Sequence, residues 1–433
     1  MSFTTDKQTL DDLGLPGKFK PNSIYSLFNK VKTAGGERLL NEMFHHPLHD
    51  PDAINARSAT FRYFQEHAFQ FPFNREDFLP VENYLGNGTS ASFIASATVL
   101  AKKKWMHSFL RDEQYSALQT GLRATINALV ALKELLHELK IGFVAPARNI
   151  FSHQKLHWLS EAYHSKEVPL LKAARYDLLL RHTLRKEMAQ VLETIYQLDV
   201  YMAVSAVARE RGFSYATALP APMNVLEAEA LWHPGLRKAV PNPVALNSAH
   251  NLVFLTGANM AGKSTLMKSI GIATYLAHAG FPVAAKGMRF SVCDGMYTSI
   301  NVPDNLDMGY SHFYAEVLRV KKVAEEVSSG KKLLVVFDEL FKGTNVKDAY
   351  DATLAVTTAF SKYRNCFFII STHIIEVGDA LKKEFDSIRF SYLPTVMNGH
   401  VPSYTYTLAE GITSDRQGMT IIENEKILEL LEE

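Results

Sequence analysis

The sequence predicts two regions of different fold class: an all-α region over residues 1–217 and an α/β domain over residues 218–433. Two observations support this division. From about residue 60 to residue 212, apolar residues recur mainly at helical spacing. Beyond residue 218, short apolar runs alternate with longer helical segments, as in a mostly parallel sheet. Gly212 and the proline-containing run 218–222 lie between the two patterns and mark a domain boundary.

The composition is that of a folded globular protein. Hydrophobic residues make up 47% of the 433 residues and charged residues 21%, which excludes an intrinsically disordered chain. The only cysteines, Cys293 and Cys366, exclude a disulfide scaffold and a four-cysteine zinc site. The N-terminus has no basic stretch followed by an apolar core, and no uninterrupted apolar run approaches the roughly 18–20 residues that span a bilayer. We therefore expect a cytoplasmic protein with no membrane segment.

The all-α region is expected to contain three long helical segments, at 92–114, 115–141 and 168–212. The last carries an apolar stripe at helical spacing, which is typical of a core. The whole chain has a net charge of +1, but residues 101–186 contain fifteen basic and seven acidic residues. A local excess of eight positive charges can attract nucleic-acid phosphates. The alternative is a set of solvated helix faces.

A glycine-rich run at residues 256–265, Thr-Gly-Ala-Asn-Met-Ala-Gly-Lys-Ser-Thr, fits the phosphate-loop pattern Gly-x-x-x-x-Gly-Lys-[Ser/Thr]. An apolar strand-like run precedes it and a helical segment follows, which is the context that a phosphate site requires. The side chain of Lys263 would reach the β- and γ-phosphates of ATP, and the hydroxyl of Ser264 would ligate Mg²⁺. The alternative is a glycine turn with an incidental lysine. The expected nucleotide-binding residues are Gly257, Asn259, Met260, Ala261, Gly262, Lys263, Ser264 and Thr265.

Two further apolar runs end in residues suited to ATP hydrolysis. The run 333–337 is followed by Asp338, expected to hold Mg²⁺, and Glu339, expected to polarise the attacking water as the catalytic base. The run 366–370 is followed three residues later by His373. A histidine leaving a core strand can sense the γ-phosphate, although a structural role is an equal alternative.

These motifs resemble those of the MutS mismatch-repair ATPases. Residues 256–265 resemble that family's Thr-Gly-Pro-Asn-Met-x-Gly-Lys-Ser-Thr loop, with Ala258 in place of proline. Residues 304–316 resemble its signature loop, residues 338–344 its Asp-Glu-x-x-x-Gly-Thr segment, and residues 371–373 its Ala-Thr-His switch. Residues 26–57 resemble the start of its helical core and lever domain. The resemblance spans nearly the whole chain, in order.

The resemblance implies an ABC-type P-loop ATPase domain at 218–433, preceded by an all-α helical core and lever domain at 1–217 that lacks the DNA clamp. The family's mismatch-recognition domain is not expected. Two copies would form a homodimer through the ATPase domain, and Ser311 would contact the ATP of the other copy. Val240 and Tyr406 would line the base. DNA is a candidate partner, without mismatch specificity.

The leading hypothesis is a MutS-like ATPase, acting in DNA repair or recombination, that couples ATP-driven dimerisation to movement of its helical levers. The alternative is a nucleotide-gated scaffold or DNA-structure-binding protein, in which turnover is incidental. A third possibility, the cytosolic subunit of an ABC transporter, is disfavoured because the Leu-Ser-Gly-Gly-Gln signature is absent from the sequence.

Overall fold

The computed structural model describes residues 3–17, 22–86, 113–165, 168–300, 312–398 and 401–413. The chain forms two compact units that are interleaved along the sequence. The α/β unit comprises residues 1–28, 44–62 and 207–433, and the helical unit comprises residues 29–43 and 63–206. Because the chain passes between the units several times, no single boundary in the sequence separates them. The domain boundary between residues 217 and 218 stays a prediction.

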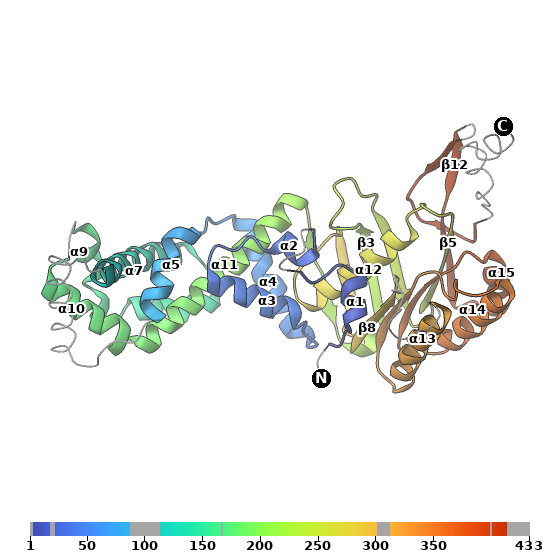
Figure 1. Cartoon of the computed structure of the whole chain (residues 1–433), viewed down its shortest axis with the longest axis horizontal. Coiled ribbons are helices and arrows are strands. Elements are labelled where there is room, and N and C mark those ends of the chain that lie inside the picture. Colours follow the sequence, from blue (N-terminus) through green and yellow to red (C-terminus); the bar gives the residue numbers. More distant parts are fainter. Residues whose placement is uncertain are drawn as a thin grey trace. The chain divides into compact units, whose positions relative to one another are not determined.

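A six-stranded sheet forms the centre of the α/β unit (Figure 1). Its strand order is β14-β11-β5-β10-β9-β8, and every pairing is parallel except that of β14 with β11. The strands are β5 (Leu252–Gly257), β8 (Gly295–Ser299), β9 (Leu333–Phe337), β10 (Phe367–Ser371), β11 (Ile388–Leu393) and β14 (Ala409–Glu410). Strands β9 and β10 are buried throughout, as expected where helices cover both faces of a parallel sheet. The three predicted strands are present as β5, β9 and β10.

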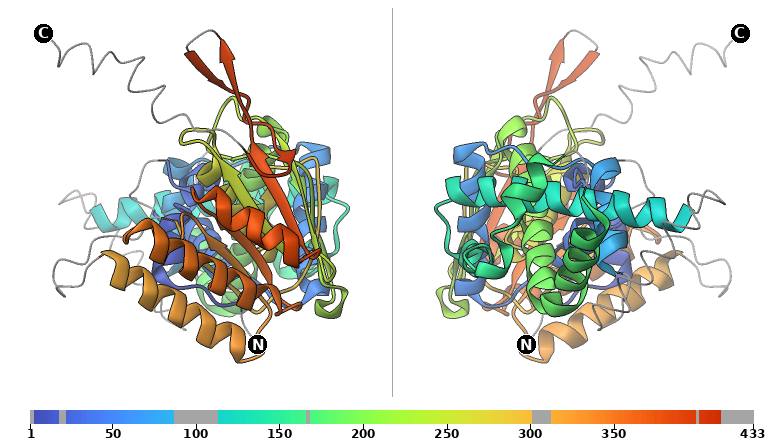
Figure 2. Two further views of the ribbon diagram at one scale, coloured as in Figure 1. Left: turned by 90° about the vertical axis from the view of Figure 1, so that its right-hand side faces the viewer. Right: turned by 90° about the vertical axis from the view of Figure 1, so that its left-hand side faces the viewer.

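Helices cover both faces of this sheet. Helices α13 (His312–Ser328), α14 (Val346–Ser361) and α15 (Ile375–Glu384) pack on one face, where Phe254 and Phe368 point (Figure 2). Successive residues of a strand point to opposite faces, so Val253 and Leu255 point away from the face of Phe254. Helix α12 (Lys263–His278) lies on that opposite face, because its Leu266 and Ile270 line the same cavity as Val253 and Leu255. The mixed α/β class predicted for this part of the chain is confirmed.

Smaller sheets flank the central one. A four-stranded sheet has the order β2-β7-β3-β4, and two further strand pairs are β1 with β6 and β12 with β13. These strands are β1 (Ser214–Tyr215), β2 (Thr217–Leu219), β3 (Val225–Leu231), β4 (Asn242–Asn247), β6 (Pro282–Val283), β7 (Gly287–Ser291), β12 (Thr395–Asn398) and β13 (Val401–Tyr404). The hairpin of β12 and β13 projects from the rest of the unit (Figure 2). Strand β13 ends at Tyr404, and the backbone turns at Tyr406, with a φ of 55°.

The first residues of the chain pack against the edge of the central sheet. Thr4 forms a parallel bridge with Gly295 of β8. Helix α1 (Lys7–Asp12) then begins at Asp6, whose carboxylate accepts a hydrogen bond from the backbone N–H of Thr9 at 3.0 Å, and α2 (Ile24–Phe28) follows. A segment within the region predicted to be all-α is thereby part of the α/β unit.

The helical unit is built on helices of different length, some of which continue into the α/β unit. They are α3 (Ala34–His45), α4 (Pro51–His67), α5 (Arg75–Gly86), α7 (Glu113–Glu138), α8 (Ala145–Phe151), α9 (Leu159–His164), α10 (Leu170–Leu178) and α11 (Arg185–Arg211). Helix α7 corresponds to the predicted segment 115–141, whereas segment 92–114 lies almost wholly outside the described residues. The predicted helical segment 168–212 corresponds to α10 and α11. A π-helical turn, Leu179–Thr183, separates α10 from α11.

Among the described residues, α11 is long and apolar enough to cross a membrane by length and composition alone. Its most apolar 18-residue window has a mean hydropathy of 1.2, and 61% of that window is buried inside the structure. Because the core helix of a soluble protein passes the same test, α11 is weak evidence for a membrane span.

Candidate nucleotide site

The loop between β5 and α12 needs glycine at two positions. Gly257 and Gly262 have φ angles of 143° and 101°, a region that side chains with a Cβ rarely adopt. A Cβ on Gly257 would also lie 3.2 Å from the carbonyl oxygen of Leu393, and one on Gly262 would lie 3.1 Å from the ring of Tyr406. No side chain caps the N-terminus of α12, so its N–H groups remain available to an anion.

Lys263, the first residue of α12, points back over this loop. Its ammonium Nζ donates hydrogen bonds to the carbonyl oxygens of Gly257 at 2.8 Å and Ala258 at 3.1 Å. The side chain is buried, and burial lowers the pKa of Lys263, while the carboxylates of Glu339 and Asp338 act in the opposite direction. A buried cation held by neutral carbonyl groups is a site that a phosphate group would complete.

The acid pair follows β9 directly, at the carboxyl edge of the parallel sheet. Asp338 Oδ1 accepts a hydrogen bond from the hydroxyl of Ser371 at 2.5 Å, and the same hydroxyl oxygen accepts from the backbone N–H of Glu339 at 3.0 Å. Ser371, the last residue of β10, therefore ties both acids to the neighbouring strand. The backbone N–H of Asp338 donates to the carbonyl oxygen of Ser299 in β8 at 2.9 Å.

Glu339 is held in its ionised form. Its Oε1 lies 2.8 Å from Nε2 of His373, and its Oε2 lies 3.8 Å from Nζ of Lys342. The hydrogen bond from His373 lowers the pKa of Glu339 and outweighs the opposing effect of burial. The structure therefore places His373 beside the acid expected to act as a base. Its role as a γ-phosphate sensor stays a prediction.

A cavity of about 510 Å³ joins the loop to these groups. The predicted residues that line it are Val240, Asn259, Met260, Gly262, Lys263, Ser264, Thr265, Glu339 and Tyr406. Gly257, Ala261, Asp338 and His373 lie outside the lining, and Ser311 lies outside the described residues.

The side chain of Asn242 connects two walls of the cavity by hydrogen bonds. Its side-chain amide donates to the carbonyl oxygen of Tyr406 at 2.9 Å and accepts from the N–H of Leu408 at 2.6 Å.

Sequence reasoning missed one wall of this cavity. Trp232, His233, Leu236 and Lys238, from the connection between β3 and β4, all line it. Burial lowers the pKa of His233, so its ring is neutral near pH 7. The signal that could have revealed this wall is the Trp-His-Pro-Gly turn at 232–235, which follows a strand.

The rim of the cavity is unusually apolar for an exposed surface. Exposed fractions are 49% for Leu236, 37% for Val240, 75% for Met260 and 45% for Tyr406. Exposed apolar side chains gathered around a cavity mark a ligand site. A planar, weakly polar group such as a nucleobase suits such a rim, with the phosphates at the loop.

The donor set also fits Mg²⁺. Among the described residues, no group of three or more His, Cys, Asp or Glu side chains can hold a metal ion. Mg²⁺ in nucleotide sites needs no such group, because one or two protein oxygens, water and phosphate oxygens complete its shell. Ser264 and Asp338 offer the required oxygens.

Comparison with known proteins adds an independent observation. Residues 253–429 match MutS domain V. This MutS match includes the phosphate loop, the acid pair and His373. The DNA mismatch repair protein MutS of Lactococcus lactis subsp. cremoris is 28% identical over 260 residues, which is 57% of this chain and 30% of that protein. MutS of Thermus thermophilus is 34% identical over 206 residues, which is 46% of this chain and 24% of that protein.

MutS of Clostridioides difficile is 28% identical over 231 residues, which is 51% of this chain. The matched segments thus span less than a third of the length of these MutS proteins.

Proposed function

We propose that the protein is a MutS-type ATPase that binds MgATP in the cavity beside α12 and hydrolyses it. The observation that carries the proposal is the convergence of three groups on one cavity: a glycine-constrained loop, the buried ammonium of Lys263 and the ionised carboxylate of Glu339. A polyphosphate requires the first two, and its hydrolysis requires the third. The similarity of residues 253–429 to MutS domain V supports the same reaction.

Each group has a part in the proposed reaction. Backbone N–H groups of the loop and the N-terminus of α12 would donate to phosphate oxygens, and Lys263 would exchange its carbonyl acceptors for them. Bound Mg²⁺ would neutralise charge on the phosphates. The Ser264 hydroxyl, which lines the cavity, fits a direct ligand of that ion, whereas Asp338, outside the lining and bonded to Ser371, fits a ligand acting through water.

Glu339 would take the proton from the water that attacks the γ-phosphorus atom. A general base must be ionised to act, and the hydrogen bond from His373 maintains that state. The adenine ring would lie against the apolar rim, where Val240 and Tyr406 are exposed.

The assembly and the biological role are part of the same proposal. A homodimer formed through the ATPase domains would bring Ser311 of one copy to the nucleotide of the other, and ATP-driven dimerisation would move the helical levers. The relatives are named as DNA mismatch repair proteins, which supports a role in DNA repair or recombination.

Nucleotide binding and turnover test the proposal directly. The purified protein should bind MgATP in calorimetric titration and release phosphate steadily, and its mass in light scattering should double when MgATP is present. Protein that retains no adenine nucleotide at millimolar Mg²⁺ would contradict the proposed reaction. Protein that binds and hydrolyses ATP as a monomer would contradict only the dimer.

A second candidate function, binding of DNA gated by nucleotide, is supported by the charges of the helical unit. Within residues 145–165 and 168–186 both acidic side chains are paired, Glu161 with Lys172 at 2.6 Å and Asp177 with Arg181 at 3.0 Å. Four exposed cations remain without an acidic partner among the described residues: Lys155, Arg175, Arg185 and Lys186. Helices α9 and α10, in this part of the unit, lie side by side with Trp158 stacked on Tyr176 at 3.7 Å (Figure 1). Unpaired cations of this kind suit a phosphate backbone.

Replacement of these four cations by glutamate should weaken binding to duplex or branched DNA and flatten its dependence on salt. Each phosphate that the variant no longer binds lowers the slope of log affinity against log salt by about 0.7–0.9. Fluorescence anisotropy over a range of salt, with and without MgATP, measures both effects. The matched control replaces four exposed lysines of the α/β unit, Lys286, Lys362, Lys382 and Lys383. Equal loss in both variants, or salt-independent binding, would contradict the assignment.

A further inference from the structure

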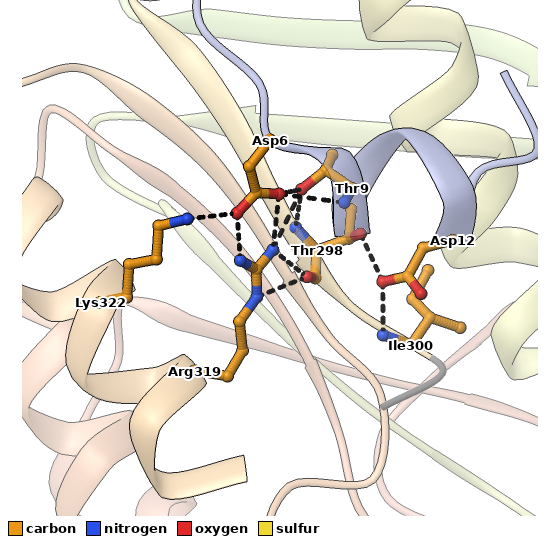
Figure 3. Close-up of polar contacts among 7 residues, drawn as sticks. All are labelled: Asp6, Thr9, Asp12, Thr298, Ile300, Arg319 and Lys322. Carbon is orange, nitrogen blue, oxygen red and sulfur yellow. Dashed lines mark hydrogen bonds and ion pairs between the residues drawn. The ribbon is translucent and has the colours of Figure 1, made fainter. Parts of the chain in front are cut away.

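We propose that residues 4–12, at the start of the chain, position the Mg²⁺-binding acid Asp338 by fixing the end of β8. The proposal rests on the function proposed above, because it assigns a purpose to these residues only if Asp338 serves a nucleotide site. Figure 3 shows the polar contacts around the end of β8, among Asp6, Thr9, Asp12, Thr298, Ile300, Arg319 and Lys322.

The N-terminal segment first joins the sheet through its backbone. The N–H of Thr4 donates to the carbonyl oxygen of Asp294 at 2.9 Å, and the N–H of Met296 donates to the carbonyl oxygen of Thr4 at 3.0 Å. Gly295 lies between them, and a Cβ there would collide with Thr4. The segment therefore covers the outer side of β8, which pairs with only one strand, β9, in the part of the sheet that the structure describes.

Helix α1 and Arg319 of α13 then hydrogen-bond to the end of β8 and to Ile300, the residue that follows it. Asp12 Oδ2 accepts from the hydroxyl of Thr298 at 2.7 Å and from the N–H of Ile300 at 3.0 Å. The hydroxyl oxygen of Thr9 accepts from the N–H of Thr298 at 3.0 Å. The carbonyl oxygen of Thr298 accepts from Nε of Arg319, in α13, also at 3.0 Å. Thr9, Asp12, Thr298 and Arg319 are all buried, so water cannot replace these partners.

Arg319 connects the same residues to α13. Its guanidinium forms an ion pair with Asp6, and Nζ of Lys322 lies 2.8 Å from the same carboxylate (Figure 3). Burial alone would raise the pKa of Asp6, but the hydrogen bonds from Arg319 and Lys322 hold it well below its usual range. The cluster therefore stays charged at neutral pH.

Ser299 connects the end of β8 to Asp338. Ser299 lies between Thr298 and Ile300, and its carbonyl oxygen accepts the backbone N–H of Asp338 at 2.9 Å. Parallel pairing of β8 with β9 places Ser299 beside Phe337, the residue before Asp338. Residues 4–12 thus fix the backbone on which Asp338 depends, although they lie more than 300 positions away in the sequence. Thr9 and Asp12 are positioning residues in this scheme.

The experiment compares Asp12→Asn and Thr9→Val with the parent protein, using Mg²⁺ as the probe. ATP affinity is measured by equilibrium binding of a fluorescent ATP analogue with and without Mg²⁺, and turnover is measured over a Mg²⁺ titration. Both variants should need about 3- to 10-fold more Mg²⁺ for half-maximal turnover and should lose part of the Mg²⁺-dependent gain in affinity. Affinity without Mg²⁺ should be unchanged, because the loop is intact. Thr9→Ser, which keeps the hydroxyl, should restore the parental Mg²⁺ response.

Asp199→Asn is the matched control, because Asp199 is also a buried carboxylate that accepts backbone hydrogen bonds, from Lys32 and Thr33 in the helical unit. It should lower the unfolding temperature without changing the Mg²⁺ response. If Asp12→Asn fails to fold, Thr9→Val decides the outcome. A lowered unfolding temperature with a parental Mg²⁺ response in Thr9→Val would overturn the inference. Failure of the parent protein itself to bind ATP would instead overturn the proposed function.

Discussion

Replacement of Lys263 by alanine is expected to reduce MgATP affinity by at least about 100-fold and to remove detectable hydrolysis. The lysine ammonium is the buried cation of the cavity, and its two present partners are neutral carbonyl groups of the loop. A charge-assisted hydrogen bond contributes about 1.5–3 kcal/mol, and Lys263 would make more than one to the triphosphate. Calorimetric titration of the variant with MgATP measures the loss.

Lys286→Ala provides the control, since Lys286 is an exposed lysine of the same unit that lies outside the cavity lining. It should bind ATP as the parent protein does. The circular dichroism of Lys263→Ala should be unchanged, because removal of a buried ammonium relieves its desolvation and leaves no buried charge unpaired. Parental ATP affinity in Lys263→Ala would show that the phosphates lie elsewhere.

Replacement of Glu339 by glutamine is expected to separate binding from hydrolysis. The amide keeps the size of the side chain but cannot accept the proton of the attacking water, so kcat should fall by about 10²–10⁴-fold. ATP affinity should change little, because the loop and Lys263 are untouched. Single-turnover phosphate release and equilibrium nucleotide binding, measured on the same protein, test the two halves of this expectation.

The pH dependence of the parent protein provides a second readout of Glu339. Its pKa is lowered by the hydrogen bond from His373, so the base is ionised at every pH above that lowered value. Turnover should therefore stay high until the pH falls below the usual range of a glutamate, and Glu339→Gln should lack that acidic limb. Glu384→Gln, at an exposed acid on α15, should match the parent. Parental kcat in Glu339→Gln would mean that another group activates the water.

Much of the candidate site could be predicted because its signals are local. The phosphate loop needs glycines at fixed spacing between a strand and a helix, and Gly257 and Gly262 have the positive φ angles that this spacing implies. Asp338 and Glu339 follow an apolar run short enough for a buried strand, and β9 is that strand. Parallel strands then bring their carboxyl ends to one edge, so His373 lies beside Glu339.

Other features escaped prediction because they depend on contacts between distant residues. The break between α10 and α11 occurs within an unbroken apolar stripe, at a π-helical turn that periodicity does not reveal. The turn that contains Trp232 and His233 carries a local signal, but the sequence does not show that this turn lines the same cavity as the phosphate loop.

The sequence by itself determined which segment can hold phosphates, which acids follow the core strands and where the helices and strands alternate. These properties arise from residues within about ten positions of one another, where backbone geometry and apolar periodicity act directly. The tertiary structure alone decided that Ser371 would tie both acids together and that Thr9 and Asp12 would bind the end of β8. Such contacts form only when strand pairing and core packing bring remote buried polar groups together, each of which must find a hydrogen-bond partner there.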